Sequence, residues 1–122
     1  FLTDVARVLR PGGLFAANAW DGGELAFARR AIASVGAVFP HVLVLAEPGV
    51  LLRTRAGNVV VVASTRALPK ADLEAWGAAA ANRMSCLTPR QAAAVVGAAE
   101  PITEAAPHTA PVPQVRREGE PR

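Results

Sequence analysis

Apolar residues near the start of the chain recur first at helical spacing and then as an unbroken run. One face of a helix over residues 1–9 is formed by Phe1, Val5, Val8 and Leu9. Pro11-Gly12-Gly13 cannot continue that helix. The apolar run over residues 14–19 lacks polar alternation, which is typical of a strand covered on both faces. Because no strand precedes this helix, we expect the chain to be the back half of a longer nucleotide-type α/β domain.

A second helix is predicted over residues 23–39. Its buried stripe is formed by Leu25, Ala28, Ile32, Val35 and Phe39. Asp21-Gly22-Gly23-Glu24 has the form of a capping box, in which Asp21 accepts from a main-chain amide and Glu24 reaches back.

Two further apolar runs, over residues 42–46 and 59–63, predict strands. Glu47-Pro48-Gly49 breaks the first of them, and the apolar residues 50–52 are compatible with its resumption. No helix is predicted between the two strands, so they must pair antiparallel. The predicted fold class is therefore α/β, with a parallel sheet that ends in an antiparallel strand pair.

Two short helices and a tail complete the predicted organisation. The first helix spans residues 70–83, with Leu73, Trp76 and Ala80 on one side. The second begins at Thr88-Pro89-Arg90-Gln91, which supplies an N-cap threonine and a proline at the first helical position, and runs to about residue 100. Proline, alanine, threonine and charge dominate afterwards, and we expect disorder over 107–122. The predicted units are a domain over 1–66, a helical extension over 67–100 and a tail over 101–122.

The composition of the chain narrows the classes of function that it can have. The 122 residues are 52 % hydrophobic, which suits one domain or part of one, and no apolar run approaches the length of a membrane helix. The net charge of +3 comes from scattered arginines with few aromatic residues, a pattern that does not predict nucleic-acid binding. Cys86 is the single cysteine, which fits a reducing, cytoplasmic location and a buried apolar role. The histidines and this cysteine lack metal-ligand spacing.

Candidate site residues follow the strands at the edge where α/β sheets bind their ligands. Asn18, Trp20 and Asp21 follow the first strand, and Glu47 follows the second. Each has two interpretations. Asp21 either lines a substrate pocket or caps the next helix, and Asn18 either lines the pocket or satisfies loop amides. Trp20 either stacks on a ligand or covers the sheet end, and Glu47 either meets an amine substrate or is solvated.

The element Leu9-Arg10-Pro11-Gly12-Gly13, followed by a strand and a helix, resembles class I S-adenosylmethionine-dependent transferases. Val38-Phe39-Pro40-His41-Val42, Pro48 and the segment Gly57–Ser64 are similar to the spermidine synthase-like branch of that group. The resemblance covers roughly residues 1–64. It implies the C-terminal half of a Rossmann-like domain and aminopropyl transfer from decarboxylated S-adenosylmethionine to a diamine in polyamine biosynthesis.

The chain also departs from that family. The Gly-rich cofactor loop and the acidic ribose ligand are not in this sequence, and the catalytic aspartate of the family is expected upstream of Phe1. Pro48-Gly49-Val50 stands where aminopropyltransferases tend to have Pro-Thr-Tyr. The alternatives are therefore an S-adenosylmethionine-dependent methyltransferase and a non-catalytic interaction module. We expect a small amine substrate, no nucleic-acid or membrane partner, an open sheet edge compatible with a homo-oligomer, and no transferase activity of this chain alone.

Overall fold

The computed structural model describes residues 1–22 and 24–102. The predicted disorder over 107–122 lies outside these residues. The helices are α1 (Leu2–Val8), α2 (Ala26–Val38), α3 (Pro48–Leu51), α4 (Lys70–Ala79) and α5 (Pro89–Val96). The strands are β1 (Phe15–Asn18), β2 (His41–Ala46), β3 (Val59–Ser64) and β4 (Ser85–Cys86).

The strands form a four-stranded sheet in the order β1-β3-β2-β4. Strand β3 pairs antiparallel with β2, with Leu43 opposite Val62, so the predicted antiparallel pair is confirmed. The prediction of a parallel sheet is wrong for the described residues, because every strand pair in them is antiparallel. Strands β1 and β2 do run in the same direction, but β3 lies between them and hydrogen-bonds to both.

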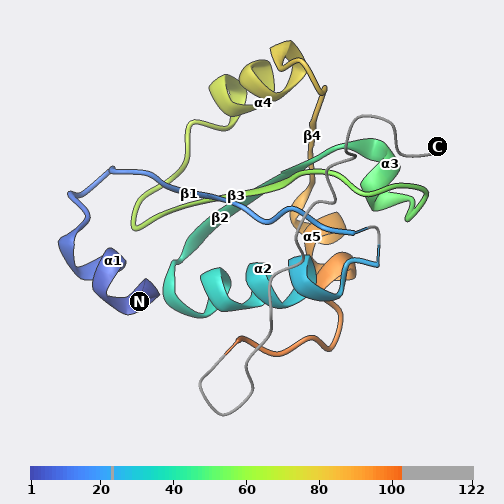
Figure 1. Ribbon diagram of the computed structural model, residues 1–122. Helices are drawn as coiled ribbons and strands as arrows, with labels where there is room; N and C mark the ends of the chain where they lie inside the picture. The colour runs from blue at the N-terminus through green and yellow to red at the C-terminus, as the bar shows by residue number, and fades with distance from the viewer. Residues whose placement is uncertain (23, 103–122) are drawn as a thin grey trace, which may run out of the picture.

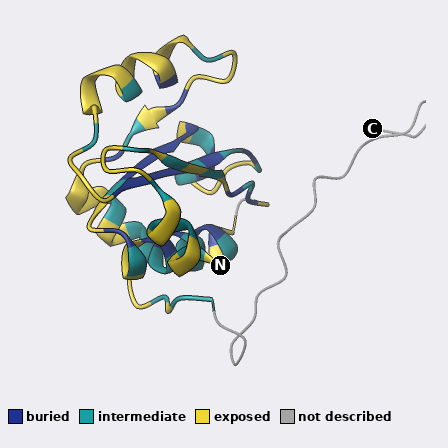
Figure 2. Cartoon of the chain, turned by 90° about the vertical axis from the view of Figure 1, so that its left-hand side faces the viewer, coloured by how far each residue is buried: buried dark blue, intermediate teal, exposed yellow. Residues whose placement is uncertain are grey.

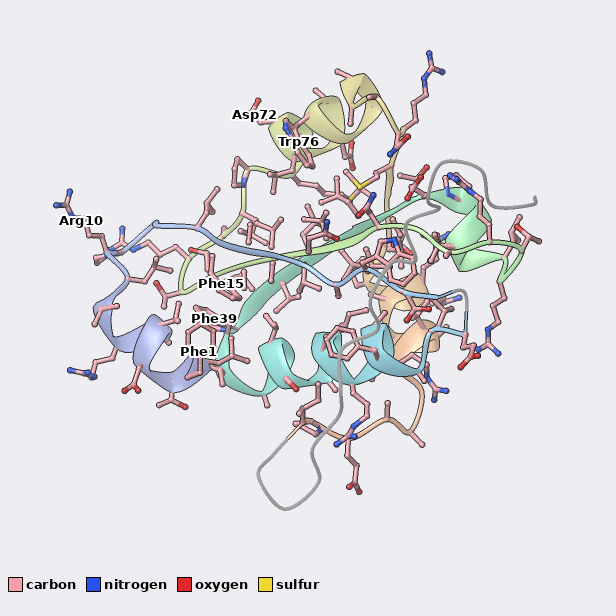
Figure 3. All side chains as sticks on the ribbon, in the orientation of Figure 1. Phe1, Arg10, Phe15, Phe39, Asp72 and Trp76 are labelled. Atoms are coloured by element: carbon pink, nitrogen blue, oxygen red, sulfur yellow. The ribbon has the colours of Figure 1, made fainter. Side chains whose placement is uncertain are left out.

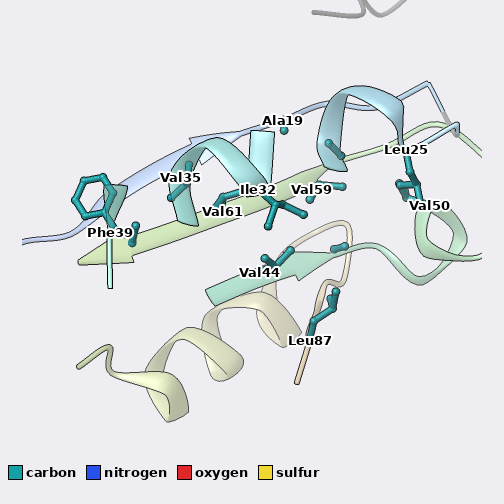
Figure 4. Close-up of a cluster of buried hydrophobic side chains, with 13 residues drawn as sticks. Ala19, Leu25, Ile32, Val35, Phe39, Val44, Val50, Val59, Val61 and Leu87 are labelled. Atoms are coloured by element: carbon teal, nitrogen blue, oxygen red, sulfur yellow. The ribbon is translucent and has the colours of Figure 1, made fainter. Parts of the chain in front are cut away.

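Helices cover the two faces of the sheet unequally (Figure 1). Helices α1, α2 and α5 lie on one face, and α4 lies on the other. The main core, between α2 and the sheet, includes Ile32, Val35 and Phe39 from the predicted helical stripe (Figure 4). A smaller core under α4 contains Leu43, Leu45, Val62 and Met84. Burial is accordingly concentrated on the strands and on the inward sides of the helices (Figure 2).

Several element boundaries differ from those predicted. Residues 50–52 do not resume a strand, because Pro48 at the first helical position begins the short helix α3 instead. Helix α4 ends at Ala79 rather than residue 83, and Trp76 on it is 53 % exposed rather than packed with Leu73. The two-residue strand β4 was not predicted, since two residues are too few to show the pattern of apolar and polar positions that indicates a strand.

Helix α5 begins as the sequence predicts and ends earlier. The side chain of Thr88 accepts from the amide of Gln91, and the Gln91 side chain accepts from the amide of Thr88, which completes the capping box. Gly97, at φ 55°, ends the helix before residue 100. The Arg29 guanidinium on α2 donates to the carbonyl oxygen of Val96 from Nε and Nη2, both at 3.2 Å. This contact fixes the end of α5 on α2.

Candidate functional site

The carboxyl ends of β1 and β2 meet at one edge of the sheet. Both strands run antiparallel to β3, so both end where β3 begins. Asn18 is the last residue of β1, Glu47 follows β2, and Asn58 precedes β3. In Figure 1 this strand-end site lies beside α3. The structure therefore brings together residues that the sequence placed at the ends of separate strands.

Glu47 is buried in this site, with only 2 % of its side chain exposed. Its Oε1 atom lies 2.6 Å from Nη2 of Arg55. Its Oε2 atom accepts a hydrogen bond of 2.6 Å from the main-chain amide of Asn58. The interpretation of Glu47 as a solvated residue is therefore wrong. Both carboxylate oxygens already have partners within the chain.

Two glycines make room for this ion pair. A side chain at Gly49 would meet Nε of Arg55 at 2.7 Å. A side chain at Gly57 would collide with Oε2 of Glu47 and would lie 2.6 Å from Cγ2 of Val50. The turn from Glu47 to Asn58 is thus closed around the carboxylate, and nothing bulkier than glycine fits at residue 57 without a shift.

Asp21 is also buried and serves the start of α2. Its Oδ1 accepts from the amide of Leu25 at 2.7 Å, and its Oδ2 accepts from the amide of Ala28 at 3.3 Å. These donors belong to the helix start, where amides lack a partner within the helix and a negative charge is favourable. The contacts support a role of Asp21 at the start of the helix, but the predicted capping box is wrong. The helix begins at Ala26 rather than residue 23, its N-cap is Leu25 in a left-handed conformation at φ 64°, and the Asp21 amide donates to the Gly57 carbonyl rather than to Glu24.

Asp21 also ties this turn to the start of β3. Its main-chain amide and carbonyl exchange hydrogen bonds of 2.9 and 3.0 Å with Gly57. The Asp21 turn and the Glu47 turn are thereby joined at one glycine.

Asn18 presents an uncharged polar group at the surface of the site. Its Nδ2 donates to Oδ1 of Asn58 at 2.8 Å, and Asn18 is exposed. Its partner is thus a side chain, rather than the loop amides proposed as the alternative. Trp20 is half-buried two residues further on. Sequence reasoning missed Asn58 as a site residue, because Gly57-Asn58 served only as a turn signal.

The two carboxylates of the site find their partners within the chain. One carboxylate faces a guanidinium and the other faces helix amides, whereas the Asn18–Asn58 amide pair is open to solvent. Such a surface can hydrogen-bond a polar ligand, whereas both carboxylates are buried and already have partners within the chain.

The described part of the chain offers few other groups for metal binding or nucleophilic catalysis. Within residues 1–22 and 24–102, no group of three His, Cys, Asp or Glu side chains could hold a metal ion. None of the helices described is long and apolar enough to cross a membrane. Burial, assisted by the nearby Glu74 carboxylate, raises the pKa of Cys86 despite the opposing effect of Lys70, which does not favour a thiolate nucleophile.

Comparison with known proteins supports the fold. No protein-family model matches the sequence, and no curated protein matches it. The structure is similar to the crystal structure of a probable spermidine synthase from Corynebacterium glutamicum ATCC 13032, with a TM-score of 0.73 and 21 % sequence identity. The match covers 94 % of this chain and 42 % of that protein, so the chain spans less than half of its length. The resemblance inferred from Leu9–Gly13 and Gly57–Ser64 is thereby confirmed at the level of the fold.

Proposed function

We propose that this chain forms the C-terminal part of a spermidine synthase-like aminopropyltransferase. The enzyme would act in the cytoplasm and transfer an aminopropyl group from decarboxylated S-adenosylmethionine to a small amine. The fold shared with a probable spermidine synthase over 94 % of this chain carries the proposal. The sequence segments that resemble that family add to this support.

In this proposal the strand-end site faces the acceptor amine. Asn18 supplies an exposed amide, and Trp20 supplies an aromatic surface beside it. Asp21 and Glu47 act through the main chain, because each holds a turn that places these groups. Transfer to an amine depends mostly on holding the two reactants in line and excluding water, so fixed turns suit this role.

Two mainly apolar pockets flank α2, one lined by residues such as Ile32, Phe39 and Val96, the other by Phe1, Phe15 and Phe27. Neither pocket is lined by Asn18 or Glu47. Because the Gly-rich cofactor loop of the family is not in this sequence, we expect this chain alone to be inactive.

A methyltransferase of the same fold is the second candidate. A dicationic diamine requires free carboxylates, whereas Glu47 is paired with Arg55 and Asp21 accepts from the amides of α2. This internal balance favours an acceptor with less positive charge. Methyl transfer from S-adenosylmethionine to a neutral acceptor would fit it.

The test is a transfer assay with the complete protein that contains this segment. Decarboxylated S-adenosylmethionine and S-adenosylmethionine are supplied separately, with putrescine as the acceptor, and the thioether product is measured. Aminopropyl transfer that requires the decarboxylated form is expected. Methyl transfer only, or no transfer with either donor, would overturn the proposal.

Variants in the site refine this assay. Trp20→Ala is expected to raise KM for the acceptor about tenfold with a smaller change in kcat, because it removes binding surface rather than a reacting group. Trp76→Ala is the matched control, since Trp76 lies on α4 and is 53 % exposed. Equal effects of the two variants would argue against a substrate role for Trp20.

A further inference from the structure

Successive residues along β1 point to opposite faces of the sheet, as in any strand. Phe15 and Ala19 point to the face that α2 covers, where Phe15 stacks on Phe39 with ring centroids 5.8 Å apart (Figure 3). Val60, which lies opposite Asn18, packs against the smaller core under α4. The side chain of Asn18 therefore belongs to the α4 face of the sheet.

Trp20 and Asn58 belong to the same face as Asn18. The register of β1 with β3 continues beyond Asn18 to the bridge between Asp21 and Gly57. Trp20 therefore lies opposite Asn58, next to that bridge. Because residues two apart in an extended segment share a face, Trp20 follows Asn18 on the α4 face. Two amides and an indole, from two segments of the chain, are thus placed together at the end of the sheet.

Hydrogen bonds fix the position of Asn58. Its main-chain amide donates to Oε2 of Glu47 at 2.6 Å, and its main-chain carbonyl accepts from the Glu47 amide at 3.4 Å. Its side-chain Oδ1 accepts from Nδ2 of Asn18 at 2.8 Å. Because Glu47 is buried, these contacts tie the two side-chain amides to the interior of the protein. The amides of Asn18 and Asn58 are thereby held in a fixed orientation.

This arrangement suits the recognition of an amino group. An amide oxygen has two lone pairs, so Oδ1 of Asn58 can accept a second hydrogen bond beside the one from Asn18. The face of an indole attracts an ammonium group through the negative charge of the ring face. Trp20 and Asn58 can therefore hold one amino group together while Glu47 keeps its partners within the chain.

We propose that Asn58 binds the amino group of the acceptor, together with Asn18 and Trp20. This role rests on the proposed transfer function, and it makes Asn58 a determinant of acceptor binding. The amino group is then held by an amide oxygen and an aromatic face, and the buried carboxylate of Glu47 supports the site from beneath without contacting the acceptor.

The test uses the complete protein that contains this segment, with putrescine as the probe. Calorimetry measures the dissociation constant of putrescine, and the transfer assay with decarboxylated S-adenosylmethionine measures KM and kcat. Asn58→Leu keeps the size of the residue and the main-chain amide that donates to Glu47, but it removes the side-chain oxygen. It should raise the dissociation constant and KM for putrescine about tenfold, as for one lost polar contact, with less than about a twofold change in kcat.

Asn58→Asp keeps an oxygen at the same position and adds a negative charge. This variant should bind putrescine at least as tightly as the wild type, because a carboxylate attracts an ammonium group. Asn82→Leu and Asn82→Asp are the matched controls, since Asn82 is exposed and precedes β4, at the opposite edge of the sheet from β1. Both should leave the dissociation constant within about twofold. Urea unfolding checks that each variant is folded.

The outcomes separate this role from the proposed function. If the wild type transfers the aminopropyl group but Asn58→Leu binds putrescine normally, or Asn82→Leu loses as much, the role of Asn58 is wrong and the proposed function stands. Weaker binding by folded Asn58→Asp would also contradict the role. Putrescine binding that depends on Asn58 without aminopropyl transfer would support the role and overturn the proposed function. A complete protein that neither binds putrescine nor transfers to it would overturn both.

Discussion

The carboxylate of Glu47 and the guanidinium of Arg55 form a 2.6 Å ion pair in which only the arginine reaches solvent. The exposed fractions of the two side chains are 2 % and 57 %. The same carboxylate accepts from the Asn58 amide, so the pair also holds the turn that leads into β3. Removal of Arg55 would leave a buried charge with one partner fewer.

Arg55→Met is therefore expected to destabilise the chain by about 1–2 kcal/mol, below the cost of breaking a fully buried pair because Arg55 is half-exposed. Urea unfolding measures this loss. The double variant Glu47→Gln/Arg55→Met should recover part of it, because the uncompensated charge is gone. Arg53→Met, at an exposed neighbour, should change the stability by less than about 0.5 kcal/mol. A loss from Arg53→Met equal to that from Arg55→Met would show that the ion pair is not the cause.

Gly57 is predicted to tolerate no side chain. Gly57→Ala would force a methyl group against Oε2 of Glu47 and Cγ2 of Val50, and a loss of about 1–3 kcal/mol is expected from such overpacking. Gly36→Ala is the opposite case, because Gly36 lies in α2 with open space around it. It should gain about 0.5–1 kcal/mol from helix propensity. Thermal unfolding of both variants checks the contrast, and a stable Gly57→Ala would show that the Glu47 turn is not rigid.

The sequence predicted those features of the fold that depend on local patterns. The stripe of α2, the antiparallel β2–β3 pair and the N-cap at Thr88 follow from spacing within a few residues. The strand order does not follow from such spacing. Strand β3 comes after β1 and β2 in the sequence, but it lies between them in the sheet. Local turn signals at residues 48 and 57 cannot show this placement.

The candidate site was likewise predicted only where it depends on local patterns in the sequence. Asn18 and Glu47 were placed correctly at strand ends, since a strand ends where its apolar run ends. The burial of Glu47 was missed, because its partner lies eight residues further on and reaches it only through the turn of α3. A lone glutamate after a strand carries no signal of such a partner.

Asp21 is predicted to contribute to stability through the amides of α2. Asp21→Ala removes the acceptor of two buried main-chain hydrogen bonds, and a loss of about 1–3 kcal/mol is expected. Asp21→Asn keeps one carbonyl oxygen as an acceptor and should lose less. Asp4→Ala is the control, because Asp4 is exposed and its contact with Arg7, at 3.6 Å, is a surface pair. Chemical denaturation ranks the three variants, and equal losses from Asp21→Ala and Asp4→Ala would refute the capping role.

Cys86 is predicted to be a slow nucleophile at neutral pH. Burial raises the pKa of its thiol, the Glu74 carboxylate raises it further, and the Lys70 ammonium lowers it. Because only the thiolate reacts, the rate of alkylation by iodoacetamide should rise with pH at a midpoint above that of an unfolded cysteine peptide. Glu74→Gln should shift this midpoint down, and Lys70→Gln should shift it up. A midpoint at or below that of the peptide would contradict the prediction, and shifts in the opposite directions would show that the two side chains do not act through their charge.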